Sequence, residues 1–331
     1  MGFFINIAMK TLEIFLFNLF MVGEDFSNIS ETRRSRNTTI IKCEGYIFEF
    51  KQIDIHFNQY KFLNQQKITT VVKILNVQST EIESILQIID DLCWLLSFCQ
   101  QSYVCRAGYK YDSGEHWHGT LGTINNKNNI IENRGQDIRY FIEQVYPTFK
   151  KLKSKRQLTV IFGYICEAYR PSLAYEISLI SHYVAIENLK QTFALDKGYK
   201  YSRGYFSHKD YPALDVAPKD LENYFPPTRK TKQYIHKKFG QVGSAEMTRR
   251  MFEDIGISRD NPMVKFSLKN RNDLIHEGLV FPFGHENYFE KAENDFHNVS
   301  NLLRKYILTL LNYKGEYYLS EDRIGPSGLI T

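Results

Sequence analysis

Several segments in the first third of the chain place apolar and polar residues alternately. Residues 38–57 and 67–77 are rich in β-branched and aromatic side chains, and they alternate in part between apolar and polar positions. This pattern is typical of half-buried β-strands. We expect two shorter strands around 102–111 and 117–124.

The hydrophobic period changes to that of a helix in residues 79–101. Apolar residues recur there at helical spacing, and Thr80 followed by Glu83 predicts a capping box at the helix start. The polar, asparagine-rich segment 123–135 is typical of a linker. We therefore predict a mixed α+β N-terminal domain, with a sensor or regulatory role, over residues 1–135.

Beyond the linker the pattern is almost wholly helical. The expected helices lie near 136–152, 156–169, 172–195, 229–240, 244–255, 262–277 and 287–312. The last of them has the most regular apolar stripe, formed by Phe289, Ala292, Phe296, Val299, Leu303, Ile307 and Leu310. The second half is therefore predicted to be an all-α bundle over residues 136–315, followed by a tail over 316–331.

Prolines mark two breaks between these helices. Pro171 ends one helix and opens the next, because proline suits a first turn but not a helix interior. The segment 209–227 contains four prolines and is expected to be a long loop.

The apolar segment 11–23 is shorter than the ~20 residues needed to cross a bilayer, and Glu13 and Asn18 interrupt it. No small-residue cleavage site follows the segment, which argues against a signal peptide. We expect a buried strand or helix here and no association with a membrane. Met9 is an alternative start to Met1.

Composition agrees with a folded protein, because 43% of the residues are hydrophobic and 24% are charged. The formal net charge of +5 is too small to indicate a nucleic-acid binder by itself. The five cysteines form no C-x-x-C pair, which argues against a zinc ribbon or a disulfide framework. We expect reduced thiols in a cytoplasmic protein.

Local signals mark both ends of a helix over residues 262–277. Asn261 and Pro262 are typical of a helix start, and Gly278 is typical of the position after a helix end. The polar residues of one face, within roughly 60° of each other, are Lys265, Lys269, Asn272 and His276. A histidine in the last turn faces the negative end of the helix dipole, which favours its protonated form.

Arg271 lies on another side of this helix, roughly 140° around from His276. Its neighbours in that direction are apolar, and an arginine there needs a carboxylate, a phosphate or a partner surface. One interpretation is structural: Arg271 pairs with a core acid such as Glu187, and His276 only caps the helix.

The motif supports a second interpretation. The sequence RNDLIH at 271–276 resembles the signature of the HEPN superfamily: an arginine, four to six residues and a histidine, often with a polar residue after the arginine. The helix 176–193 resembles the first long helix of abortive-infection and ApeA-like HEPN proteins, with Glu187 in the place of their frequent acidic residue. The N-terminal half loosely resembles the mixed domain that precedes such modules.

This resemblance implies a HEPN bundle and metal-independent RNA cleavage of a prokaryotic defence or toxin type. RNA carries its own nucleophile, the 2′-hydroxyl. His276 would act as general acid or base, Arg271 would stabilise phosphate charge, and Asn272 would orient the imidazole or bind phosphate. The products would be a 2′,3′-cyclic phosphate and a 5′-hydroxyl. Family members commonly place two motifs across a two-fold axis, so we expect a homodimer.

A basic run supports RNA as the partner. Residues 219–250 hold eight lysines and arginines against three acids, with aromatic residues between them. The expected RNA-binding residues are Arg229, Lys230, Lys232, Lys237 and Lys238. A solvated helix face is the other interpretation of this run.

We expect neither a metal nor a cofactor. His116 and His118 lack further ligands nearby in the sequence, and the chain has no P-loop and no dinucleotide-binding glycine pattern. A phage-derived trigger or an antitoxin is a further possible partner. The alternative to an enzyme is a HEPN module that binds RNA or protein without cleaving.

Overall fold

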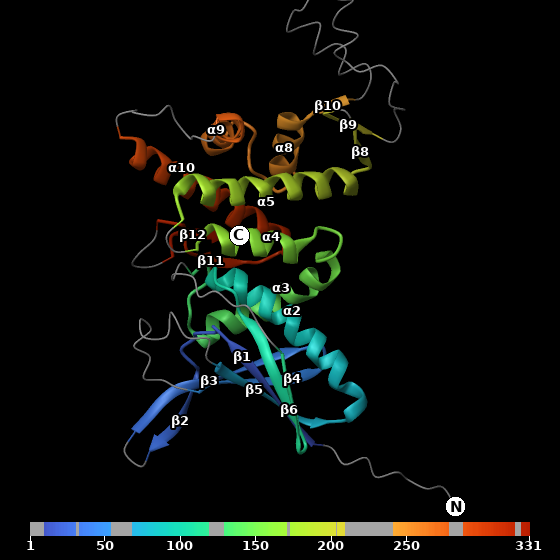
Figure 1. Cartoon of the computed structure of the whole chain (residues 1–331), viewed down its shortest axis with the longest axis vertical. Helices are drawn as coiled ribbons and strands as arrows, with labels where there is room; N and C mark the ends of the chain where they lie inside the picture. Colours follow the sequence, from blue (N-terminus) through green and yellow to red (C-terminus); the bar gives the residue numbers. More distant parts are fainter. Residues whose placement is uncertain are drawn as a thin grey trace, which may run out of the picture.

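The computed structural model describes residues 10–30, 33–53, 68–118, 129–170, 173–202, 204–208, 241–277, 287–321 and 326–331. It has an antiparallel sheet in the N-terminal half and mainly helices afterwards, so the α+β class is confirmed. Figure 1 shows the sheet at one end of the molecule, with the helices stacked on it in successive layers.

The large sheet contains seven of the described strands, and all neighbouring strands are antiparallel. In spatial order they are β2 (Asp25–Ser30), β3 (Arg33–Cys43), β4 (Tyr46–Gln52), β5 (Ile68–Val77), β1 (Lys10–Phe17), β6 (Cys105–Tyr111) and β7 (Gly114–Trp117). Strand β1 lies between β5 and β6 and buries Leu12, Ile14 and Leu16 on one face. The apolar N-terminal segment is thus a buried strand.

The expected strand segment 38–57 is split into two strands. Glu44 and Gly45 both have positive φ, +51° and +83°, and they form the tight turn between β3 and β4. Two such residues match the twist of antiparallel strands, so this segment folds back as a hairpin. The second short strand also differs from the prediction, because β7 ends at Trp117 and residues 119–128 lie outside the described part.

The helix expected at 79–101 is present as a short 3-10 turn, η1 (Ser79–Glu81), followed by α2 (Ile82–Gln100). The predicted capping box of Thr80 and Glu83 is wrong. The capping residues are Gln78 and Glu81, and the Gln78 backbone N–H donates to Glu81 Oε2 at 2.8 Å. The helical turn therefore begins two residues earlier than the pattern indicated.

The later helices agree closely with the hydrophobic pattern wherever they are described. They are α3 (Gly135–Leu152), α4 (Leu158–Ala168), α5 (Tyr175–Asp196), α8 (Ser244–Glu253), α9 (Pro262–Glu277) and α10 (Tyr288–Leu310). The helix expected at 229–240, the loop 209–227 and Pro171 lie outside the described residues. In α10 the apolar stripe is buried, except that Phe289 is 77% exposed in the first turn and Leu310 is partly buried in the last turn.

The second half also contains short strands that the helical pattern did not predict. Strands β8 (Tyr199–Ser202), β9 (Tyr205–His208) and β10 (Gln241–Gly243) form one antiparallel sheet, and β11 (Gly315–Tyr317) pairs with β12 (Gly328–Ile330). The expectation of an almost wholly helical second half is corrected to that extent.

One hydrophobic core runs through the sheet and the helices. Helix α3 packs on β3 and α2, α4 packs on α2 and α5, and α5 in turn contacts α8, α9 and α10. Four of the five cysteines are buried and all five are free thiols. Among the described residues, no helix combines the length and the apolarity needed to cross a membrane.

Candidate functional site

Helix α9 begins as its sequence predicts. Asn261 Oδ1 accepts a hydrogen bond from the backbone N–H of Met263 at 2.9 Å, which is the expected N-cap bond. Val264 and Leu274 are buried toward the bundle, so these positions fix which side of the helix faces outward.

The polar face of α9 is described only in part. Lys265 and Lys269 are exposed, and Lys265 Nζ pairs with Asp260 at 2.9 Å. Asn272 and His276 lie in the last two turns of the helix, and their side chains are outside the described part.

Arg271 forms an ion pair with Glu187 of α5. The distance from Arg271 Nε to Glu187 Oε1 is 2.8 Å, and about a quarter of each side chain is exposed, 25% and 24%. The expected carboxylate partner of Arg271 is therefore present. The two residues are 84 positions apart in sequence, and their ion pair joins α5 to α9. This contact orients the guanidinium, and about a quarter of the arginine side chain stays accessible to solvent.

A buried lysine, Lys190, is the second cation that contacts the Glu187 carboxylate. Lys190, one helical turn along α5, is only 2% exposed and donates hydrogen bonds to Glu187 and, at 2.5 Å, to Ser244 Oγ at the start of α8. Its ammonium group also lies 5.7 Å from the ring centroid of Phe206. Burial lowers the pKa of Lys190, and the charge of Arg271 lowers it further, while the hydrogen bond and charge of Glu187 oppose the shift.

A second polar pair lies within electrostatic reach of Arg271. Tyr183 of α5 donates a hydrogen bond to Asp295 Oδ2 of α10 at 3.2 Å, and both side chains are buried. Burial and the charge of Asp295 raise the pKa of Tyr183, and the positive charge of Arg271 acts in the opposite direction. Helices α5, α8, α9 and α10 thus each contribute a polar group around the arginine.

An exposed apolar stripe on α5 ends beside this cluster. Ile177, Ile180 and Val184 are 51%, 40% and 37% exposed, and they recur at the spacing of one helix face. Glu187 continues the same spacing, so the Glu187–Arg271 pair lies at the end of the stripe. Contiguous exposed apolar surface of this kind marks interaction sites in soluble proteins.

Other residues singled out from the sequence lie elsewhere. The basic run Arg229, Lys230, Lys232, Lys237 and Lys238 falls in residues 209–240, outside the described part. Its described continuation, Arg249 and Arg250, pairs with Glu246 within α8.

The two histidines near β7 are engaged separately. The His116 ring stacks on Tyr109 with centroids 4.6 Å apart, and His118 Nε2 lies 3.0 Å from a guanidinium nitrogen of Arg106. Each therefore has its own protein partner.

The sequence patterns did not predict Lys190, Tyr183 or Asp295 as part of this site. Lys190 lies three residues after Glu187, the spacing of a helical ion pair, and Asp295 falls within the apolar stripe of α10. A charged residue inside an apolar stripe is the signal that would have found Asp295. No protein-family model matches the chain, and neither curated proteins nor solved structures give a significant match.

Proposed function

We propose that this protein is a metal-independent endoribonuclease of the HEPN type, acting on tRNA or mRNA in prokaryotic defence or as a toxin. One observation carries the proposal. Arg271, the first residue of the R-x₄-H motif, is held by Glu187 at the surface of the helix that also carries His276. An oriented guanidinium on a partly exposed side chain suits recognition of a phosphate.

The charge around Arg271 supports a role toward phosphate. Glu187 is shared by two cations, Arg271 and Lys190, and Asp295 of α10 is a second carboxylate near the arginine. The exposed Lys265 and Lys269 lie on the same helix as Arg271. An RNA phosphate would therefore meet an arginine that is already positioned.

In the proposed reaction the RNA 2′-hydroxyl attacks the adjacent phosphorus. His276 takes the proton from that hydroxyl or gives one to the leaving 5′-oxygen, and Arg271 stabilises the charge of the phosphorane-like transition state. Asn272, one turn before His276, orients the imidazole or binds phosphate. The basic residues 229–238 track the RNA backbone.

A homodimer is part of this proposal. The exposed stripe of Ile177, Ile180 and Val184 leads to the Glu187–Arg271 pair, so a second copy docked there would bring two motifs close to one groove. Arg271 and His276 lie on different sides of α9, and a groove formed by two copies would receive both side chains.

One observation favours a second function, an RNA- or protein-binding module without cleavage. Arg271 already has a carboxylate partner in Glu187, which also fits a structural role for the arginine. In this alternative the basic residues hold RNA, and the motif helps only to join α5 and α9.

Incubation of purified protein with total tRNA in EDTA separates the two functions, with Arg271→Ala and His276→Ala variants matched for folding. The nuclease is expected to leave 2′,3′-cyclic phosphate ends, and both variants are expected to lose cleavage. RNA retention without cleavage, weakened by changing Lys237 and Lys238, would instead support the binding module.

A further inference from the structure

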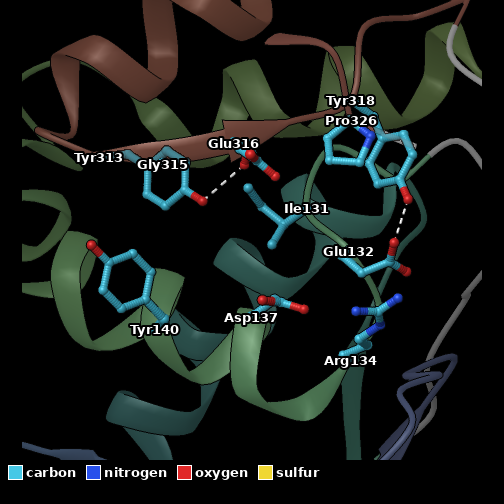
Figure 2. Close-up of a pocket in the computed structure, with 10 residues that line it drawn as sticks. All are labelled: Ile131, Glu132, Arg134, Asp137, Tyr140, Tyr313, Gly315, Glu316, Tyr318 and Pro326. Carbon is cyan, nitrogen blue, oxygen red and sulfur yellow. Dashed lines mark hydrogen bonds between the residues drawn. The ribbon is translucent and has the colours of Figure 1, made fainter. Parts of the chain in front are cut away.

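A pocket of about 340 Å³ lies between α3 and the C-terminal segment 313–318, outside the site around Arg271. Figure 2 shows Asp137 and Tyr140 of α3 on one side and Tyr313 and Glu316 on the other, with Ile131 between them. The pocket therefore joins the loop and helix that follow the large sheet to the segment that follows the last helix.

Hydrogen bonds hold the wall formed by the C-terminal segment in place. The Tyr318 backbone N–H donates to the carbonyl of Ile130 at 2.8 Å, and the Tyr318 hydroxyl donates to the Glu132 carboxylate. Gly315 has a φ of +153°, and a Cβ at this position would lie 2.7 Å from the Tyr313 hydroxyl oxygen. Gly315 therefore packs closely against Tyr313, and this contact and the hydrogen bonds of Tyr318 form the pocket wall without a ligand.

The charge of the pocket is unbalanced. Glu132, Asp137 and Glu316 face a single cation, Arg134, which leaves a net charge of −2 on the lining. Burial raises the pKa of Asp137, and the charges of Glu132, Glu316 and the nearby Glu24 raise it further, although Arg134 lowers it. A positive charge placed in the pocket would relieve this repulsion, and an anion would increase it.

The shape of the pocket favours an organic cation over a metal ion. Tyr140 meets the buried Tyr313 edge to face, with ring centroids 6.4 Å apart, and Tyr140 is 51% exposed, so it offers aromatic surface to a cation. Within the described residues, no three carboxylate, histidine or cysteine side chains converge as a metal ion requires. A volume of about 340 Å³ lies at the lower end of the range for ligand pockets.

We propose that this pocket binds a small organic cation, an alkyl chain that carries a guanidinium or ammonium group. The cationic group lies between Asp137 and Glu316, and the chain packs on the exposed ring of Tyr140. The ligand thereby links α3 to the C-terminal segment. This inference is independent of the nuclease proposal, because the two sites share no residue.

Isothermal titration calorimetry on the full chain tests the pocket with four probes of similar size: butylguanidinium, butylammonium, butylurea and butyrate. Butylurea has nearly the shape of butylguanidinium without its charge, and butyrate reverses the charge. We expect at least one of the two cations to bind and both other probes to fail. Asp137→Asn and Glu316→Gln are each expected to weaken cation binding at least tenfold, while Glu290→Gln, an exposed change on α10, leaves it unaltered.

Three results would overturn the proposal. They are failure of both cations to bind, equal binding by butylurea, and cation binding that Asp137→Asn and Glu316→Gln leave unchanged. Should Asp137→Asn fail to fold, the exposed Glu316→Gln alone decides the last point. Circular dichroism of each variant shows that the fold is retained.

Discussion

Arg271 of α9 and Glu187 of α5 form an ion pair that is supported from behind by the buried ammonium group of Lys190. The two cations are not equivalent. Arg271 reaches solvent, whereas Lys190 is buried and has Glu187 as its carboxylate partner. The carboxylate therefore neutralises an internal charge and orients a surface charge at the same time.

This difference predicts unequal effects on stability. Glu187→Gln removes the carboxylate and leaves Lys190 buried without it, so we expect a loss of about 2–4 kcal/mol in the free energy of unfolding. Arg271→Gln leaves Glu187 paired with Lys190 and should cost about 1 kcal/mol or less. Urea denaturation of both variants measures the difference.

A double variant is the control for that comparison. Lys190→Met removes the buried charge, so adding it to Glu187→Gln should restore part of the lost stability. Equal losses for Glu187→Gln and Arg271→Gln, or no recovery in the double variant, would contradict the assigned role of Lys190.

A pH dependence follows from His182 of α5. The ring is fully buried against Tyr169 and Phe296, and neither ring nitrogen has a hydrogen-bond partner among the described residues. Burial and the charge of Arg304 lower the pKa of His182 from 6.5 to about 3. Below pH 6.5 the unfolded chain binds a proton that the folded chain does not, so stability falls as the pH is lowered.

Replacing His182 removes this penalty. We compare the free energy of unfolding of His182→Leu with that of wild type at each pH. The difference should favour the variant by about 2 kcal/mol more at pH 5 than at pH 8. Denaturation curves at the two pH values measure this difference. A variant that loses stability on acidification as steeply as wild type would show that His182 is not the responsible group.

Two glycines predict effects of different size. A Cβ at Gly135, where α3 begins, would lie 2.0 Å from Thr39 Oγ1 of β3, so Gly135→Ala should destabilise the fold by about 2–3 kcal/mol through overpacking. A Cβ at Gly45 would meet nothing within 4 Å, and only its positive φ opposes substitution. Gly45→Ala should therefore cost about 1 kcal/mol. Thermal unfolding of both variants gives the comparison, and the reverse order would contradict close packing of α3 on the sheet.

The exposed stripe on α5 predicts the behaviour of the proposed dimer. Ile180→Asp places a charge in the middle of the stripe and should shift the protein from dimer to monomer in sedimentation velocity experiments. Leu75→Asp changes an apolar and more exposed residue on β5 of the large sheet, and it should leave the dimer intact. A wild type that stays monomeric at high concentration would refute the dimer.

Local signals in the sequence predicted the helices well, but they predicted the polar contacts less completely. The start of α9 is determined by Asn261, Pro262 and the hydrogen bond from Met263 N–H to Asn261. These residues are adjacent in sequence, so the helix start could be predicted without tertiary contacts. One interpretation of the sequence named Glu187 as the carboxylate partner of Arg271, and the crossing of α5 and α9 brings the two groups together. The burial of Lys190 could not be predicted, because it depends on contacts with Ser244 and Phe206, which lie outside α5.

The strands β8 and β9 were missed for a different reason. Tyr199 and Tyr201 alternate with polar residues in β8, whereas Tyr205 is followed directly by Phe206 in β9. Each strand has only four residues, which is too short for a period to be distinguished from a loop. The capping box was misplaced because Gln78 and Glu81 overlap with the similar pair Thr80 and Glu83. Both errors arise where only a few residues carry the local pattern.

The most direct test of the account is the single-turnover rate of RNA cleavage by His276→Ala, with protein in excess over RNA and EDTA present. Glu290→Gln, an exposed change on the neighbouring helix α10, is the matched control. We expect His276→Ala to cleave at least about 100-fold more slowly than wild type, with RNA affinity nearly unchanged, because an acid–base group acts on the chemical step. Cleavage by His276→Ala at the wild-type rate would contradict the assignment of α9 as the catalytic helix.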